Sequence, residues 1–205
     1  MKEQLEILVI EDNPKHISDA KKLLDDRAER GIISNVDYAS TFSEAQELLN
    51  RKSYDGIISD IFFPEKSGEN EREYGTTIAE LCLQRKTPFV LVTSTFHHGR
   101  KTQLVCNFIR NKGMQLVDSN PKDRDGEAES KYWAGAFVAL TYLIEGLNGG
   151  ELTINEEGIS QTGKEYGPND GVFNIESQEW RLKDRYENDA VFKKAFDKYC
   201  KGMFE

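Results

Sequence analysis

The stretch SDIFFPEKSG, residues Ser59–Gly68, decides the fold prediction, because an apolar strand ends there on a carboxylate, Asp60. The residues DGII come directly before it, and Pro64 and Gly68 indicate a loop after it. A buried carboxylate without a partner is costly, since it must lose its hydration or take up a proton. Asp60 therefore either ends a strand near water or belongs to a site that needs its charge.

The composition predicts a soluble globular protein with a hydrophobic core. The chain has 205 residues, 38% apolar and 31% charged, and its net charge of -9 argues against binding nucleic-acid phosphates through a broad basic face. No apolar run approaches the roughly 20 residues that span a bilayer, and the acidic start does not resemble a signal peptide. Cys82, Cys106 and Cys200 lack metal-ligand spacing and are expected to be reduced thiols of a cytoplasmic protein.

Short apolar strands alternate with helical segments along the first three quarters of the chain. Strands are predicted at residues 6–10, 35–39, 55–60, 88–94 and 115–119. Helices are predicted at residues 14–30, 43–50, 76–85, 100–112 and 129–147. This alternation predicts an α/β fold, a doubly wound five-stranded parallel sheet with helices on both faces. Ligands of such sheets bind at the carboxyl ends of the strands.

Polar side chains stand at three of these strand ends. Glu11 and Asp12 follow the first strand, Asp60 ends the third, and Thr93 and Ser94 end the fourth. Three carboxylates at one sheet edge repel each other unless a cation neutralises them. Mg²⁺ suits such hard oxygen ligands, and Thr93 could hold an anionic group on Asp60. A single strand-end aspartate is more often a turn former, but the three ends together indicate a site.

From about residue 5 to residue 146 the chain resembles a receiver domain of bacterial two-component response regulators, the CheY-like fold. The motifs are ILVIEDNP, DGIISDIFFPEKSG and PFVLVTS. The resemblance implies that Asp60 is the phosphoacceptor and that Glu11 and Asp12 form a Mg²⁺ pocket. It also implies that the carbonyl of Phe62 completes the metal site and that Thr93 receives the phosphoryl group. A sensor histidine kinase or phosphotransfer protein would supply that group, and a downstream protein would read the change.

The predicted end of strand five departs from the receiver pattern. Receivers carry a lysine before a proline there, and alignment of GMQLVDSNP, residues 113–121, places Asn120 at this position. A neutral amide brings no cation, so its contact with phospho-aspartate is expected to be weak. Lys122 supplies the cation if the strand register is shifted. Val117 stands where the family has an aromatic switch residue.

Two segments near the predicted site lie outside the family's motifs. The charged insertion ENEREY, residues 69–74, is interpreted as a solvated loop, with a functional lid as the alternative. His97 and His98 follow strand four and are interpreted as surface residues rather than metal ligands, because no third ligand stands at a fixed spacing. Small Ser94 is expected to leave access for the phosphodonor.

Residues 148–205 are predicted to form a C-terminal extension to a receiver-like domain of residues 1–147. ELTINEEGISQT suggests a hairpin with a turn near Glu157 and Gly158. An amphipathic helix capped by Asn188 or Asp189 is predicted from apolar residues at helical spacing. They are Phe192, Ala195, Phe196, Tyr199 and Met203. This stripe is expected to pack on its own domain, with a homodimer or partner contact as the alternative.

Two functions follow from these observations. The leading hypothesis is a response regulator receiver, not an enzyme, which accepts a phosphoryl group on Asp60 with Mg²⁺ and signals through protein–protein interaction. The alternative is a pseudo-receiver, an interaction module that kept the acidic pocket and lost switching, as Asn120 would suggest. A phosphoryl-transfer hydrolase of the haloacid dehalogenase type needs a second acid where Phe62 stands, so that class is disfavoured. No DNA-binding, kinase, cyclase or nucleotide-binding motif is present.

Overall fold

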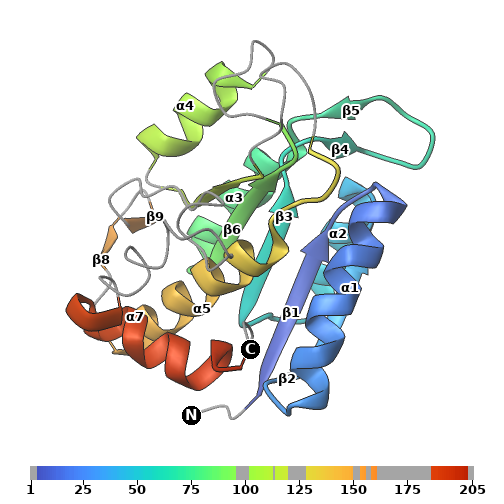
Figure 1. The fold of residues 1–205 in the computed structure, drawn as a ribbon. Helices are drawn as coiled ribbons and strands as arrows, with labels where there is room; N and C mark the ends of the chain where they lie inside the picture. The colour runs from blue at the N-terminus through green and yellow to red at the C-terminus, as the bar shows by residue number, and fades with distance from the viewer. Residues whose placement is uncertain are drawn as a thin grey trace.

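A five-stranded parallel sheet forms the centre of the molecule (Figure 1). The computed structural model describes residues 4–95, 102–112, 114–119, 128–149, 153–155, 158–160 and 186–202. The strands of the sheet are β1 (Leu5–Ile10), β2 (Ile33–Ala39), β3 (Gly56–Asp60), β6 (Phe89–Thr93) and β7 (Leu116–Asp118). Their order is β2-β1-β3-β6-β7, the doubly wound order that flavodoxin and CheY share. The predicted fold class is therefore confirmed.

The central strands are apolar because helices cover both faces of the sheet. Every residue of β3 and β6 is buried. Their register sets Asp60 beside Val92, one residue before Thr93, so the ends of the two strands lie level with each other. Each predicted strand is present, and the fifth is shorter than expected at three residues.

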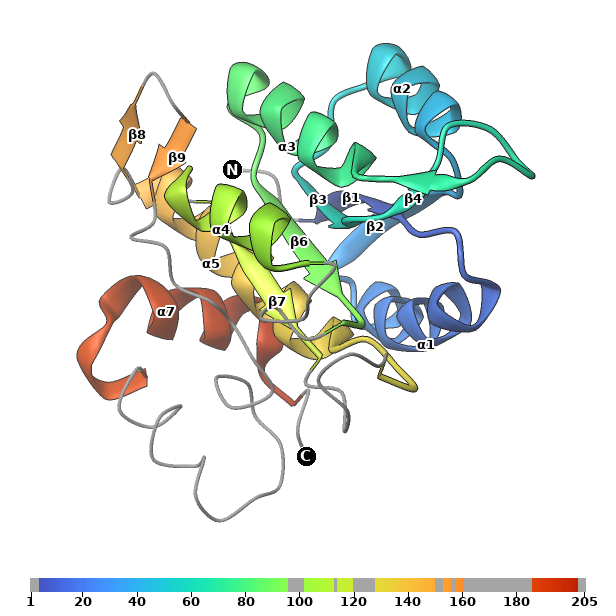
Figure 2. The ribbon, with the colours of Figure 1, turned by 90° about the horizontal axis from the view of Figure 1, so that it is seen from above.

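Five helices pack around the sheet in two layers. They are α1 (Pro14–Glu29), α2 (Phe42–Arg51), α3 (Tyr74–Arg85), α4 (Gln103–Asn111) and α5 (Trp133–Gly149). Residues of α1 and α5 share one core cluster, and residues of α2, α3 and α4 share the other. Figure 2 shows α1 and α5 on one side of the sheet and α2 and α3 on the other. Helix α5 is apolar around its circumference because it lies between the sheet and the C-terminal helix.

The insertion of residues 69–74 contributes one strand, β5 (Glu71–Arg72), to a small hairpin and is not only a solvated loop. β4 (Phe63–Pro64) pairs antiparallel with this strand. Directly after the hairpin, the chain passes so close to β3 that only glycine fits at position 75. A Cβ atom there would lie 2.2 Å from the carbonyl oxygen of Asp60. The hairpin is thus fixed at both of its ends next to Asp60.

The described part of the C-terminal extension packs on the α/β part of the chain. β8 (Thr153–Asn155) and β9 (Gly158–Ser160) form the predicted hairpin, and α7 (Ala190–Ala195) continues into a π-helical turn, η1 (Phe196–Cys200). The side chain of Asp189 caps α7 by accepting a hydrogen bond from the N–H of Phe192 at 2.9 Å.

The apolar face of the C-terminal helix joins the core of α1, α5 and the sheet. Phe192 is fully buried, and its ring lies 6.3 Å from the ring of Tyr142 in α5. The predicted stripe therefore packs on its own domain, although Met203 lies outside the described residues. All three cysteines are buried and reduced. No helix in the described part of the chain is long and apolar enough to cross a bilayer.

Candidate functional site

Three carboxylates meet at the carboxyl edge of the sheet. Asp60 ends β3, and Glu11 and Asp12 follow β1, which lies next to β3. One carboxylate oxygen from each of the three lies within 4.8 Å of the others. The N–H of Ile61 donates to Oδ1 of Asp60 at 2.7 Å, which fixes the orientation of that carboxylate. The convergence predicted from the strand ends is thus present in the structure.

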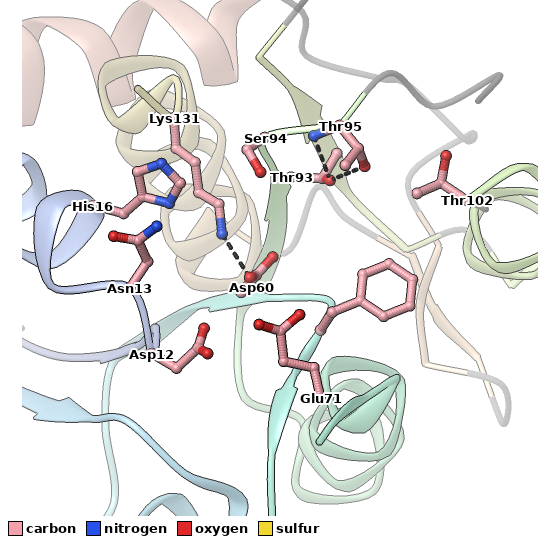
Figure 3. A pocket seen from close by; sticks show the side chains of 11 residues that line it. Asp12, Asn13, His16, Asp60, Glu71, Thr93, Ser94, Thr95, Thr102 and Lys131 are labelled. Carbon is pink, nitrogen blue, oxygen red and sulfur yellow. Dashed lines mark hydrogen bonds and ion pairs between the residues drawn. The ribbon is translucent and has the colours of Figure 1, made fainter. Parts of the chain in front are cut away.

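A buried lysine, Lys131, completes this cluster. Its Nζ lies 2.7 Å from Oδ2 of Asp60 (Figure 3). The same atom lies 2.6 Å from Oε2 of Glu11, and the lysine side chain is 1% exposed. Lys131 comes from the segment just before α5. The expectation that the pocket lacks a cation is therefore wrong. Asn120 and Lys122, the two residues considered for this position, lie outside the described residues.

Lys131 was missed because the loop before it is long. The receiver pattern predicts the lysine directly after strand five. In this chain β7 ends at Asp118, and α5 begins only at Trp133. The ammonium thus comes from the start of the helix and not from the end of the strand. A sequence signal exists, since Lys131 is the last charged residue before the apolar run WAGAFVALTYLI, where a charge needs a buried partner.

The ion pairs shift the pKa values of the buried groups in opposite directions. Burial raises the pKa of Asp60 to about 6, with the charge of Glu11 adding to the increase and Lys131 opposing it. Burial also disfavours the charged form of Glu11, but the nearby imidazole of His16, whose Nδ1 lies 3.6 Å from Oε1, and the charge of Lys131 outweigh it and lower the pKa of Glu11. For Lys131, the two carboxylates outweigh burial and raise its pKa. Lys131 and Glu11 are therefore both charged at neutral pH.

The donor set of this edge fits a hard divalent cation. Burial, then Glu11 and Asp60, raise the pKa of Asp12, which indicates that the negative charge in the cluster exceeds what Lys131 neutralises. Both Oε atoms of Glu11 are already engaged, Oε1 by the N–H of Asn13 at 3.0 Å and Oε2 by Lys131. Asp12 and Asp60 are then the carboxylates that would hold Mg²⁺, with the carbonyl of Phe62 as the implied third ligand.

His16 is a second residue that the sequence analysis missed. It lies on the buried face of α1, and its Nδ1 is 3.6 Å from Oε1 of Glu11. The imidazole is 5% exposed and lines the same cavity as Asp60. The sequence signal for it is its position on the inner face of a helix that begins beside the acidic pair. His97 and His98, which were considered instead, lie outside the described residues.

A cavity of about 200 Å³ opens over Asp60, and hydroxyl groups line the wall that faces Lys131 across it. Thr93, which ends β6, and the next residue, Ser94, are buried in this wall together with Thr102. The hydroxyls of Thr93 and Thr95 lie 2.7 Å apart, and the N–H of Thr95 donates to the Thr93 oxygen at 3.1 Å. Thr93 thus stands where it was expected, beside Asp60.

The insertion hairpin adds a residue to this cavity. Glu71 of β5 lines it together with Asp60 and Phe62. In Figure 3, the side chain of Glu71 reaches toward Asp60, and Lys131 approaches from the other side of the view. The interpretation of residues 69–74 as a solvated loop is therefore incomplete, since the hairpin carries one residue into the site.

Comparisons with known proteins find likenesses among solved structures. The sequence matches no protein-family model and no curated protein. Among solved structures, the chain is similar to the signal receiver domain of an HD domain-containing protein from Pseudomonas fluorescens Pf-5. The two are 16% identical with a TM-score of 0.44, over 58% of this chain and 77% of that one.

Two further receiver domains are similar to the chain. One belongs to a signal transduction histidine kinase from Syntrophus aciditrophicus, with 22% identity and a TM-score of 0.42, over 58% of this chain and 80% of that one. The other is the beryllofluoride-activated NtrC4 receiver domain dimer, with 18% identity and a TM-score of 0.41, over 57% of this chain and 85% of that one. The strand order of the sheet, rather than these likenesses, confirms the CheY-like fold that the sequence predicts.

Proposed function

We propose that this chain is a signal receiver that accepts a phosphoryl group on Asp60 in the presence of Mg²⁺ and signals through protein–protein interaction. The observation that carries the proposal is the ion-paired cluster of Asp60, Lys131 and Glu11 beside Asp12. A structural salt bridge needs two charges, whereas this cluster has three carboxylates around one ammonium. It also borders a cavity rather than closed core. That surplus of negative charge is suited to a divalent cation.

Each residue has a role in this reaction. The Asp60 oxygen attacks phosphorus, and the hydrogen bond that the N–H of Ile61 donates to Oδ1 holds the carboxylate in place. Lys131, which already lies against Asp60, offers its ammonium to the oxygens of the incoming group. Thr93 offers a hydroxyl from the opposite wall. Mg²⁺, when bound by Asp12, Asp60 and the Phe62 carbonyl, would neutralise part of the phosphoryl charge.

Phosphorylation of Asp60 would change the positions of side chains in the cavity wall. A phosphoryl group brings roughly two negative charges, and Lys131 and Thr93 are the groups able to move toward them. The hydroxyl of Thr93 is hydrogen-bonded to that of Thr95, two residues further along the chain. The phosphoryl group would therefore act on Thr93 and Thr95, and a downstream protein would read the change at this end of β6. A sensor histidine kinase or phosphotransfer protein would be the donor.

Intact-mass measurement tests the proposal. The protein is incubated with acetyl phosphate and Mg²⁺, and the wild type should gain the mass of one phosphoryl group. Asp60→Asn should gain none, whereas Asp25→Asn, which alters an exposed aspartate of α1 outside the cavity, should behave as the wild type does. A wild type that binds Mg²⁺ and gains no mass would favour the pseudo-receiver, an interaction module without phosphorylation.

A further inference from the structure

Glu71 is held at the cavity by a rigid hairpin. Its pairing partner across the hairpin is Pro64, four residues after Asp60. Tyr74, directly after the hairpin, donates a hydrogen bond from its hydroxyl to Glu65 at 2.9 Å. The ring of Tyr74 also stacks on Phe42 of α2, with centroids 4.6 Å apart. The hairpin is therefore fixed to the body of the protein on both strands, and Glu71 has a defined position.

The geometry limits where water could reach a phosphoryl group on Asp60. Oδ1 of Asp60 accepts from the N–H of Ile61, and Oδ2 contacts Lys131. A phosphoryl group on this carboxylate must therefore project into the cavity. Water displaces a carboxylate from phosphorus by in-line attack, from the side opposite the bond that breaks. That side is the cavity itself, and Glu71 lines it.

The carboxylates around the cavity are not equivalent. Glu11 is buried and paired with Lys131, and the proposed function gives Asp12 and Asp60 to the metal and the phosphoryl group. Glu71 is the carboxylate of the described cavity wall that has neither role. It is also more exposed than the other three, so it can exchange a proton with solvent.

We propose that Glu71 is the base that removes the phosphoryl group from Asp60, so that the hairpin acts as a built-in timer of the phosphorylated state. This inference rests on the proposed function. The oxygen of a water molecule bonds to phosphorus, and the bond between phosphorus and the Asp60 oxygen breaks. The electron pair of that bond stays on the Asp60 carboxylate. A proton of the water passes to Glu71, which releases it to solvent, and the products are inorganic phosphate and free Asp60.

The test is the decay of the phosphorylated protein after the donor has been removed. Glu71→Gln keeps the size of the side chain and removes its basicity, so the half-life should lengthen at least about tenfold, toward the roughly 100-fold that a positioned base supplies. Glu71→Asp keeps a carboxylate, so its half-life should lengthen less than that of Glu71→Gln. The matched control is Glu69→Gln, an exposed glutamate of the same hairpin that does not line the cavity, and its decay should equal that of the wild type.

A second measurement separates a base from a mere negative charge. Salt shortens the screening length from about 10 Å at 0.1 M to about 3 Å at 1 M. A difference between wild type and Glu71→Gln that persists at 1 M salt supports proton transfer, and one that vanishes there overturns it. Decay of Glu71→Gln at the wild-type rate would also overturn the inference and leave the proposed function intact. A wild type that never gains a phosphoryl group would overturn the proposed function.

Discussion

The Nζ atom of Lys131 lies 2.7 Å from Oδ2 of Asp60, at a point where the sequence suggested the neutral amide of Asn120 or, in a shifted register, the ammonium of Lys122. The same ammonium contacts Glu11 at 2.6 Å. One lysine thus joins the ends of two neighbouring strands, β1 and β3, to the start of α5. The main argument for the pseudo-receiver hypothesis was the absence of a cation beside Asp60. This contact removes that argument.

Replacing Lys131 with methionine should destabilise the protein. The change leaves Glu11 and Asp60 buried without their shared cation, a situation that costs about 3 kcal/mol or more. The loss should shrink at pH 5, because both carboxyl groups can then take up protons in the variant. Urea denaturation at pH 7.5 and pH 5 measures both effects.

The control for that experiment is Lys22→Met. Lys22 pairs with Asp19 at 3.1 Å, but its side chain is 74% exposed. Exposed pairs contribute about 1 kcal/mol at most. Equal losses in the two variants would contradict the structural role given to Lys131.

The pocket could be predicted from the sequence where its residues follow strands directly. Asp60, Asp12 and Thr93 were identified because parallel strands bring their carboxyl ends to one edge, and this needs only the right assignment of strands. Lys131 and Glu71 could not be found in this way. Each comes from a connection whose path depends on packing, the long segment before α5 and the hairpin after β3. Strand periodicity says nothing about where such segments return to the sheet.

The place of the C-terminal helix was only partly predictable. The spacing of Phe192, Phe196 and Tyr199 indicated a buried face, but not which surface it covers. The structure places this face against α5, and a sequence signal exists in the composition of α5, in which Glu145 is the only charged residue. A helix with so few polar residues needs cover on both sides.

The Mg²⁺ affinity should fall as the pH drops through about 6. The metal needs ionised carboxylates, and burial raises the pKa of Asp60 to about 6 and raises that of Asp12 as well. Each group then binds a proton that Mg²⁺ must displace, so below pH 6 the affinity should decrease by roughly tenfold or more per pH unit. Calorimetric titration at pH 7.5, 6 and 5 measures this, and an affinity independent of pH would contradict the assignment of these ligands.

The raised pKa of Asp60 should also make the free energy of unfolding depend on pH. The pKa of Asp60 is higher in the folded than in the unfolded protein, so the folded state binds more protons between about pH 4 and pH 6. Without metal, the Asp60 contribution to the free energy of unfolding should therefore decrease as the pH rises through this range. Asp60→Asn should remove this dependence, which denaturation at several pH values can detect.

His16 should help to lower the pKa of Glu11. The imidazole is the first of the groups that lower the pKa of this carboxyl against the effect of burial. His16→Leu should raise the pKa of Glu11, whereas His16→Gln keeps an N–H donor and should raise it less. Carboxyl chemical shifts of Glu11 across a pH titration report the value directly. The same pKa in the leucine variant and the wild type would show that His16 only fills space.

The C-terminal helix should contribute to the stability of the whole domain. Phe192→Ala removes a fully buried ring from the core shared with α5, and such changes cost about 3–5 kcal/mol. Phe108→Ala in α4 is the matched control, because its ring is 37% exposed, and it should cost far less. Thermal denaturation compares the two. Equal melting temperatures for Phe192→Ala and the wild type would mean that the helix is an independent arm.

The most direct test of the central claim is to locate the phosphoryl group chemically. After incubation with acetyl phosphate and Mg²⁺, borohydride reduces an aspartyl phosphate to homoserine, and peptide mass spectrometry then identifies the converted residue. The account predicts homoserine at position 60 in the wild type and no conversion in Asp60→Asn. Conversion at another residue, or none in a protein that binds Mg²⁺, would contradict the assignment of Asp60 as the phosphoacceptor.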